Sequence, residues 1–167
     1  MKVIFLDIDG VLVCYDSVDK TATRPKLKTD PDNNRHLPHV PAMNNLNRIL
    51  KETGAKMVLS STWRHLEGLD NTNAHFIKYG LSEPCIDETP SLDQRMDNGL
   101  WKNAQRGDEI IKWMEGKDIE SFVILDDDSD MSDVKDRLVK CSMDHGLTEE
   151  LADRAIEILN KTTNKGE

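Results

Sequence analysis

KVIFLDIDG, residues 2–10, joins a short apolar run directly to two aspartates and a glycine. The run from Lys2 to Leu6 is β-branched and apolar without polar alternation, which is typical of a strand buried on both faces of a parallel sheet. Asp7 and Asp9 follow, and residues two apart in an extended chain face the same side. Two carboxylates side by side repel each other, so this strand end favours a bound cation.

Two further apolar runs have the same form and also end in polar residues. Residues 56–59 (KMVL) precede Ser60 and Ser61, and residues 121–125 (SFVIL) precede the three aspartates 126–128. Ligands of parallel α/β sheets bind beyond the carboxyl ends of the strands. We therefore expect the polar residues after the three strands to meet in one site.

Between these strands the apolar spacing is helical. It predicts helices over residues 41–53, about 72–79, 108–115 and 149–159, with Thr148 as the N-cap of the last. Short segments at 84–86 and 138–141 are weaker strand candidates, and residues 14–40 and 87–104 are expected to be loops. Alternating strands and helices predict an α/β fold, a Rossmann-like parallel sheet with helices on both faces.

The expected organisation is one domain over residues 1–161, with a flap loop at about 14–40 and a frayed tail at 162–167. The length of 167 residues suits a single domain. No apolar run is long enough to span a membrane, and the aspartates inside the apolar N-terminus argue against a signal peptide. Three widely separated cysteines without a CxxC spacing favour a reducing, cytoplasmic location.

The charge balance limits the partners that we expect. A formal net charge of −9 argues against nonspecific binding of long duplex nucleic acid, which needs a basic face. A local exception lies in the flap, where the segment 20–28 holds Lys20, Arg24, Lys26 and Lys28 and no acidic residue. This segment is either a patch that contacts phosphates or a solvated loop.

The aspartates from 126 onwards raise the possibility of a calcium loop of the EF-hand type. A loop that begins at Asp126 would place Met131 where glycine is required and Arg137 where the final glutamate is required, which excludes that reading. The later aspartates fit a solvated acidic loop. Asp126 and Asp127 directly follow the buried run, which favours metal binding for these two.

Four stretches together resemble the haloacid dehalogenase-like (HAD) superfamily of phosphohydrolases. LDIDGVL (6–12), VLSS (58–61) and VILDDD (123–128) are similar to its first, second and fourth motifs. Arg106, at the start of RGDEIIKWM, stands where the third motif has a basic residue, and Lys102 is the alternative. STWR, RGDEI and ILDDDSDM more closely resemble the HAD domains of polynucleotide 3′-phosphatases and of bacterial and phage RNA-repair proteins.

This resemblance implies a phosphomonoesterase that forms an aspartyl-phosphate. Asp7 would be the nucleophile, and Asp9 would protonate the leaving oxygen and then activate water. Ser60 would hydrogen-bond a phosphoryl oxygen, and Arg106 would offset negative charge. Ser61 and Arg64, which follow the second strand, are candidate substrate-binding residues.

The resemblance also implies a magnesium cofactor. Asp7, the backbone carbonyl of Asp9, and Asp126 or Asp127 would hold Mg²⁺, and the family pattern favours Asp127. Asp128 remains a further candidate, because the sequence does not distinguish which of the three consecutive aspartates is the metal ligand.

The connections between the strands leave no room for a large cap domain, so an open site is expected. Such a site suits a macromolecular substrate, and we expect nucleic-acid 3′ ends or nucleotides. A phosphatase of a small metabolite or phosphoprotein is the alternative within enzymes. A HAD-like domain that binds without turnover is the alternative from another class.

Overall fold

The computed structural model describes residues 1–15 and 27–161. The basic flap residues Lys20, Arg24 and Lys26 lie outside this part of the chain, as does the tail at 162–167. The predicted phosphate contacts of that segment and the predicted fraying of the tail therefore stay predictions. Within the described ranges, no helix has both the length and the apolar character that crossing a membrane requires.

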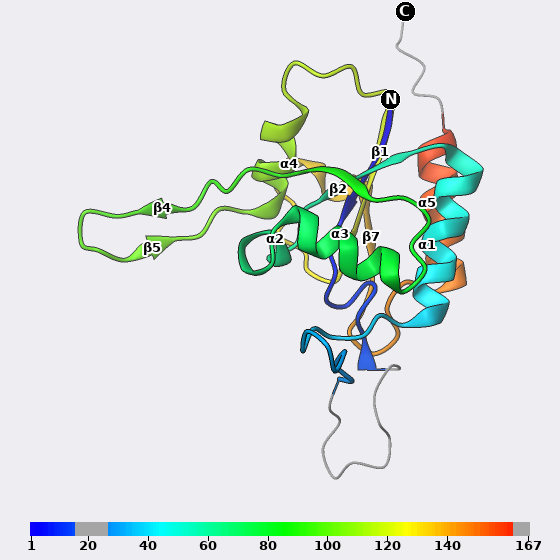
Figure 1. Cartoon of the computed structure of the whole chain (residues 1–167). Coiled ribbons are helices and arrows are strands. Elements are labelled where there is room, and N and C mark those ends of the chain that lie inside the picture. Colours follow the sequence, from blue (N-terminus) through cyan, green and yellow to red (C-terminus); the bar gives the residue numbers. More distant parts are fainter. Residues whose placement is uncertain (16–26, 162–167) are drawn as a thin grey trace, which may run out of the picture.

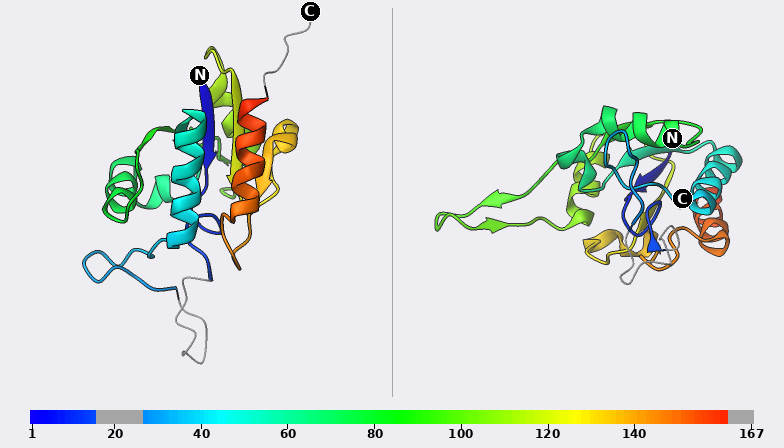
Figure 2. Two further views of the ribbon diagram at one scale, coloured as in Figure 1. Left: turned by 90° about the vertical axis from the view of Figure 1, so that its right-hand side faces the viewer. Right: turned by 60° about the horizontal axis from the view of Figure 1, so that its bottom comes forward.

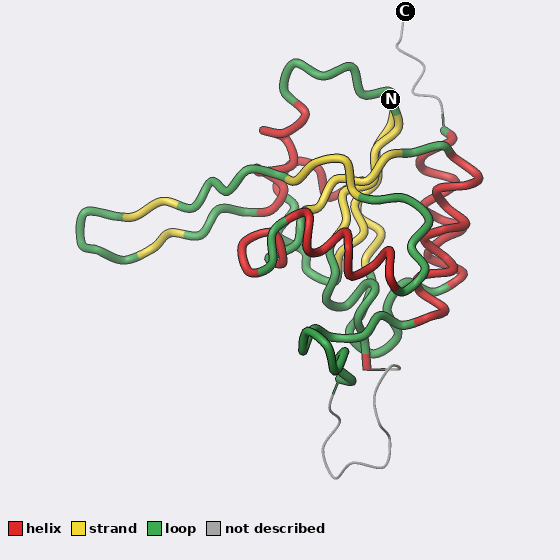
Figure 3. Tube along the Cα trace, viewed as in Figure 1, coloured by secondary structure: helices red, strands yellow, loops and turns green. Residues whose placement is uncertain are grey.

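The centre of the molecule is a parallel sheet of five strands, which confirms the predicted α/β fold (Figure 1). Its strand order is β3-β2-β1-β6-β7. The strands are β1 (Lys2–Leu6), β2 (Lys56–Leu59), β3 (Cys85–Glu88), β6 (Ser121–Asp126) and β7 (Leu138–Lys140). Figure 3 shows these strands running together through the middle of the fold.

Both faces of β1 are buried, as its unbroken apolar sequence predicts. Ile4 and Leu6 point into a core shared with α1 (Val40–Thr53) and α5 (Glu149–Asn160), which lie side by side on one face (Figure 2). Val3 and Phe5 point into a second core that contains apolar residues of α4 (Arg106–Met114) and the 3-10 helix η2 (Ser132–Arg137). Alternation along one strand thus supplies both cores.

The helix predictions hold with shifted ends. The helix predicted at 72–79 is α3 (Leu69–Lys78), and the short helix α2 (Trp63–Leu66) directly after β2 was not predicted. The backbone N–H of Leu151 donates to Thr148 Oγ1 (3.3 Å), which confirms the predicted N-cap of α5. A four-residue helix is too short to show a period of 3.6 residues in the sequence, so α2 could not be predicted from apolar spacing.

The prediction that residues 87–104 form only loop is wrong. The segment continues β3 as far as Glu88 and then forms an antiparallel hairpin of β4 (Gln94–Arg95) and β5 (Trp101–Lys102). This hairpin stands away from the body of the molecule (Figures 1 and 2). Its strands have two residues each, too few for an alternating pattern to be recognised.

Candidate active site

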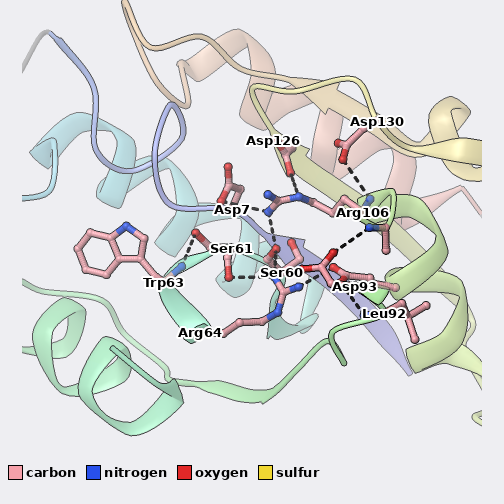
Figure 4. A network of polar contacts seen from close by, with 12 residues as sticks. Asp7, Ser60, Ser61, Trp63, Arg64, Leu92, Asp93, Arg106, Asp126 and Asp130 are labelled. Atoms are coloured by element: carbon pink, nitrogen blue, oxygen red, sulfur yellow. Dashed lines mark hydrogen bonds and ion pairs between the residues drawn. The ribbon is translucent and has the colours of Figure 1, made fainter. Parts of the chain in front are cut away.

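The strand register brings the polar residues at the carboxyl ends of three strands to one edge of the sheet. Leu6 is paired with Leu59 on one side and with Leu125 on the other. The ladder continues by one residue, because Asp7 N–H donates to the Leu125 carbonyl and Ser60 N–H donates to the Leu6 carbonyl, both at 2.9 Å. The carboxyl ends of β1, β2 and β6 therefore meet, as the sequence predicted, and their polar side chains gather there (Figure 4).

Three carboxylates come together at this edge. One oxygen from each of Asp7, Asp126 and Asp127 lies within 4.8 Å of the others. Burial, and then the charge of Asp7, raise the pKa of Asp126 and of Asp127. Gly10 makes this approach possible, because a Cβ at its position would lie only 2.4 Å from the Asp127 side chain. Such a cluster of hard oxygen atoms has the chemistry of a divalent cation site.

Asp126 and Asp127 have different surroundings within the cluster. Asp126 is fully buried, and its Oδ1 accepts the N–H of Asp128 (2.8 Å) while its Oδ2 lies 3.2 Å from Arg106 Nε. Asp127 is partly exposed beside Gly10. Among the described residues, Asp126 Oδ2 has this ion pair but no hydrogen bond. The partial exposure of Asp127 favours Asp127 as the carboxylate that is available to a metal. The Asp128 side chain is exposed and is not part of the cluster.

Arg106 is the basic residue that reaches the carboxylates. It is the first residue of α4, and its Nη1 lies 3.3 Å from Asp7 Oδ1 and also donates to the carbonyl of Ser60. Burial opposes the charge of this guanidinium, but the neighbouring carboxylates outweigh it and raise the Arg106 pKa. Lys102, the alternative basic residue, is exposed on β5 of the hairpin.

A glycine fixes the position of the helix that carries Arg106. A Cβ on Gly107 would lie 2.1 Å from the Met131 carbonyl oxygen, so only glycine lets α4 approach the loop after β6 this closely. The Gly107 N–H donates to the Asp130 carbonyl at 3.1 Å, and the Arg106 N–H donates to Asp130 Oδ2 at the same distance. Arg106 therefore projects from a helix end that is hydrogen-bonded to the loop after β6.

The Asp9 side chain is not part of the carboxylate cluster. Its Oδ2 accepts the indole N–H of Trp63 at 2.9 Å. Burial raises the pKa of Asp9; the Trp63 hydrogen bond opposes that rise and the charge of Asp7 adds to it. The Trp63 ring packs against Phe76, with ring centroids 5.5 Å apart, and its N–H also orients Asp9.

Ser60 presents a hydroxyl without a partner. Both Ser60 and Ser61 are fully buried, and among the described residues Ser60 Oγ has no hydrogen-bond partner. Ser61 Oγ accepts the N–H of Trp63 at 3.4 Å. A buried hydroxyl that the protein leaves unsatisfied can donate to an oxygen of a bound ligand.

Arg64 does not join the carboxylate cluster. Its Nη2 lies 2.5 Å from Glu109 Oε2, and its Nη1 donates to the carbonyls of Ser60 (2.7 Å) and Ser61 (3.0 Å). Only 4% of the Arg64 side chain is exposed. Direct contact of Arg64 with substrate stays a prediction; the residue lines a cavity together with Arg106. The hydrogen bonds of its guanidinium hold the turn that carries Ser60 and Ser61 (Figure 4).

Breaking this buried ion pair is expected to destabilise the fold. Glu109→Ala would leave the Arg64 guanidinium buried without its carboxylate, which costs about 3–5 kcal/mol of unfolding free energy. The matched control is Glu83→Ala, because Glu83 pairs with Lys56 at 2.7 Å but both side chains are 45% exposed. That change should cost less than about 1 kcal/mol. Urea unfolding followed by circular dichroism measures both, and equal losses would contradict a structural role for the Arg64 pair.

The described end of the flap is held against α3. Asp30 is fully buried, and it accepts from Lys78 Nζ at 2.8 Å, which together with the Asp32 N–H holds the Asp30 pKa at about 2. Arg35 forms an ion pair with Glu67 at 2.6 Å. These contacts could not be predicted from the sequence, because each joins residues more than thirty positions apart.

The chain matches one family model over most of its length. This model, described as the HAD domain in Swiss Army Knife RNA repair proteins, covers residues 3–152 and thus includes all of the site residues. No curated protein sequence matches the chain.

Proposed function

Because the chain belongs to the family of HAD domains in Swiss Army Knife RNA repair proteins, we propose that it is a phosphatase of nucleic-acid ends. The reaction would be Mg²⁺-dependent hydrolysis of a phosphomonoester on a 3′ end or a nucleotide, through an aspartyl-phosphate on Asp7. The observation that carries the proposal is the contrast between two aspartates at the end of β1. Asp7 faces Arg106 and the carboxylate cluster, whereas Asp9 faces Trp63.

The donor atoms of the site fit the proposed metal. Mg²⁺ prefers oxygen ligands, and carboxylate oxygens of Asp7, Asp126 and Asp127 lie within 4.8 Å of one another. Asp7, Asp127 and the backbone carbonyl of Asp9 would hold the ion, with Asp126 behind them in contact with Arg106. When bound, Mg²⁺ supplies positive charge that offsets the charge of the phosphoryl group.

In the first proposed step, an oxygen of the Asp7 carboxylate forms a bond to phosphorus and the ester P–O bond breaks. Asp9 gives its proton to the leaving oxygen, which departs as an alcohol. The raised pKa of Asp9 supports this role, because it increases the fraction of Asp9 that carries a proton. Arg106 and the Ser60 hydroxyl would hold the phosphoryl oxygens.

In the second step, a water oxygen forms a bond to phosphorus and the bond between Asp7 and phosphorus breaks. Asp9, now ionised, takes the proton of the water, and inorganic phosphate leaves. Both aspartates return to their starting states. The hydrogen bond from Trp63 to Asp9 would keep that carboxyl group in position through both proton transfers.

A phosphate-release screen in Mg²⁺ tests this proposal. The panel contains 3′- and 5′-phosphorylated oligonucleotides, nucleotides, sugar phosphates and phosphopeptides. We expect the highest kcat/KM with a 3′-phosphorylated oligoribonucleotide. A preference for sugar phosphates or phosphopeptides would contradict the substrate class, and no release from any compound would leave a HAD domain that binds without turnover.

A further inference from the structure

The hairpin of β4 and β5 places an exposed tryptophan on an arm beside the active site. Gln94 pairs with Lys102, and Arg95 pairs with Trp101, across the two strands. Trp101 is 65% exposed, whereas the other two tryptophans, Trp63 and Trp113, are 6% and 5% exposed. An indole that is exposed to this extent adds little to the stability of the fold and is accessible to a ligand.

The foot of the hairpin is bound to the site. The Leu92 N–H donates to Glu109 Oε1 at 3.1 Å, and Glu109 is the partner of the buried Arg64. Opposite it, the Ala104 N–H donates to Asp93 Oδ1 at 2.8 Å, two residues before Arg106. The two strands therefore leave the body at defined points next to α4 (Figure 1).

The two faces of the hairpin differ in how their residues connect to the cavity beside Arg106. Alternation puts Trp101 and Arg95 on one face together with Asn103 and Asp93, and we call this the Trp101 face. Asn103 and Asp93 line a cavity of about 230 Å³ whose wall includes Arg106. The Trp101 face thus continues into the cavity beside the guanidinium that contacts Asp7.

The opposite face carries Gln94 and Lys102, which line a second cavity of about 690 Å³ whose wall also includes Asn103. None of Asp7, Asp9, Ser60 and Arg106 lines that larger cavity. By alternation, the exposed Leu100 belongs to this opposite face, next to Trp101 in sequence.

The distance between Trp101 and Arg106 suits a short segment of single-stranded nucleic acid. Trp101 and Arg106 are about five residues apart, so their Cα atoms are separated by at most about 18 Å. At about 3.4 Å per stacked nucleotide, that distance corresponds to roughly five nucleotides. Aromatic side chains bind the bases of single strands by stacking, independently of sequence, and an arginine beside them can contact the phosphates.

We propose that the Trp101 face is a docking arm for the single-stranded nucleic acid whose terminal phosphate enters the active site. Trp101 stacks on a base up to about five nucleotides from the end, and Arg95 contacts a backbone phosphate. This inference rests on the proposed phosphatase function and adds a binding site to it. A nucleoside monophosphate is too short to reach the arm, so the arm acts only on longer substrates.

Two neighbouring substitutions test the arm by kinetics. Trp101→Ala removes the indole, and Leu100→Ala is the matched control, because Leu100 is 64% exposed on the opposite face. With a 3′-phosphorylated oligoribonucleotide of about eight nucleotides, Trp101→Ala should raise KM about 5- to 100-fold. With a nucleoside 3′-monophosphate KM should rise less than about twofold, and Leu100→Ala should leave both values unchanged. Equal KM values for Trp101→Ala and wild type on the oligonucleotide would overturn the proposal and leave a protein as the candidate occupant.

A binding measurement provides a readout without turnover. An unphosphorylated oligoribonucleotide, which resembles the product, should quench the fluorescence of the exposed Trp101 in the wild-type protein. Trp101→Phe should lose the quenching yet keep most of the oligonucleotide affinity, because phenylalanine also stacks, whereas Trp101→Ala should lose affinity. Equal oligonucleotide affinity of all three proteins would overturn the proposal of a docking arm. Absence of phosphate release by the wild type, with quenching intact, would instead overturn the phosphatase function alone.

Discussion

Asp7→Asn is expected to lower phosphate release by about 10⁴-fold or more, the range seen when a covalent nucleophile is removed. The asparagine amide cannot form the bond to phosphorus that the carboxylate oxygen would form. The fold should survive, because the substitution removes one of three carboxylates that lie within 4.8 Å of one another and so relieves their repulsion. Release of inorganic phosphate from a 3′-phosphorylated oligonucleotide measures the loss.

Asp133→Asn is the matched control for this change. It removes the same charge from an exposed aspartate of η2, outside the carboxylate cluster. Its rate should stay within about twofold of wild type, since exposed positions away from a site contribute little. Circular dichroism and thermal melting verify that both variants are folded. Wild-type release by a folded Asp7→Asn protein would exclude Asp7 as the nucleophile.

Removal of divalent metal is expected to abolish activity, and Mg²⁺ should restore it. Without a cation, the charges of Asp7 and Asp127 would repel the phosphate of the substrate. Ca²⁺ should substitute poorly, because it prefers more ligands and longer bonds than a small carboxylate site supplies. Phosphate release in excess EDTA, followed by titration with each metal, measures both effects. Full activity in EDTA would contradict the metal assignment.

Metal binding should also be visible without substrate. At about a hundredfold excess over Kd, Mg²⁺ stabilises a folded protein by about 2.7 kcal/mol, which raises Tm by about 5–10 °C for a chain of this size. Asp127→Asn should lose most of this shift and need at least about tenfold more Mg²⁺ for half-maximal activity. Asp128→Asn, whose side chain is exposed beside the cluster, should keep the shift. The opposite pattern would identify Asp128, and not Asp127, as the metal ligand.

Much of the central fold could be predicted because its signals are local. β1 and β2 end directly before Asp7 and Ser60, and the apolar run of β6 ends before its last residue, Asp126. The pattern predicted α1 from apolar residues at helical spacing before Gly54, which lies at the C-cap with a positive φ of 66°. Because parallel pairing aligns the strand ends, the meeting of Asp7, Ser60 and Asp126 also followed from the sequence.

The roles of several side chains could not be predicted because their partners lie far away in the sequence. The sequence placed both Arg64 and Arg106 at the site, yet Arg64 binds the distant Glu109 and Arg106 reaches Asp7. Trp63 donates to Asp9 across 54 positions. Which cation or donor meets which carboxylate depends on how the helices after β2 and β3 pack on the sheet.

The sequence by itself thus determined the chemistry at the strand ends, because unbroken apolar runs define buried strands and the residues after them. Only the tertiary structure decided which side chains contact the polar residues at the strand ends. It separated Asp9 from the acidic cluster, paired Asp126 with Arg106, and set the Trp101 face of the hairpin toward the cavity beside Arg106. These outcomes depend on contacts between segments that are distant along the chain, and packing in three dimensions determines such contacts.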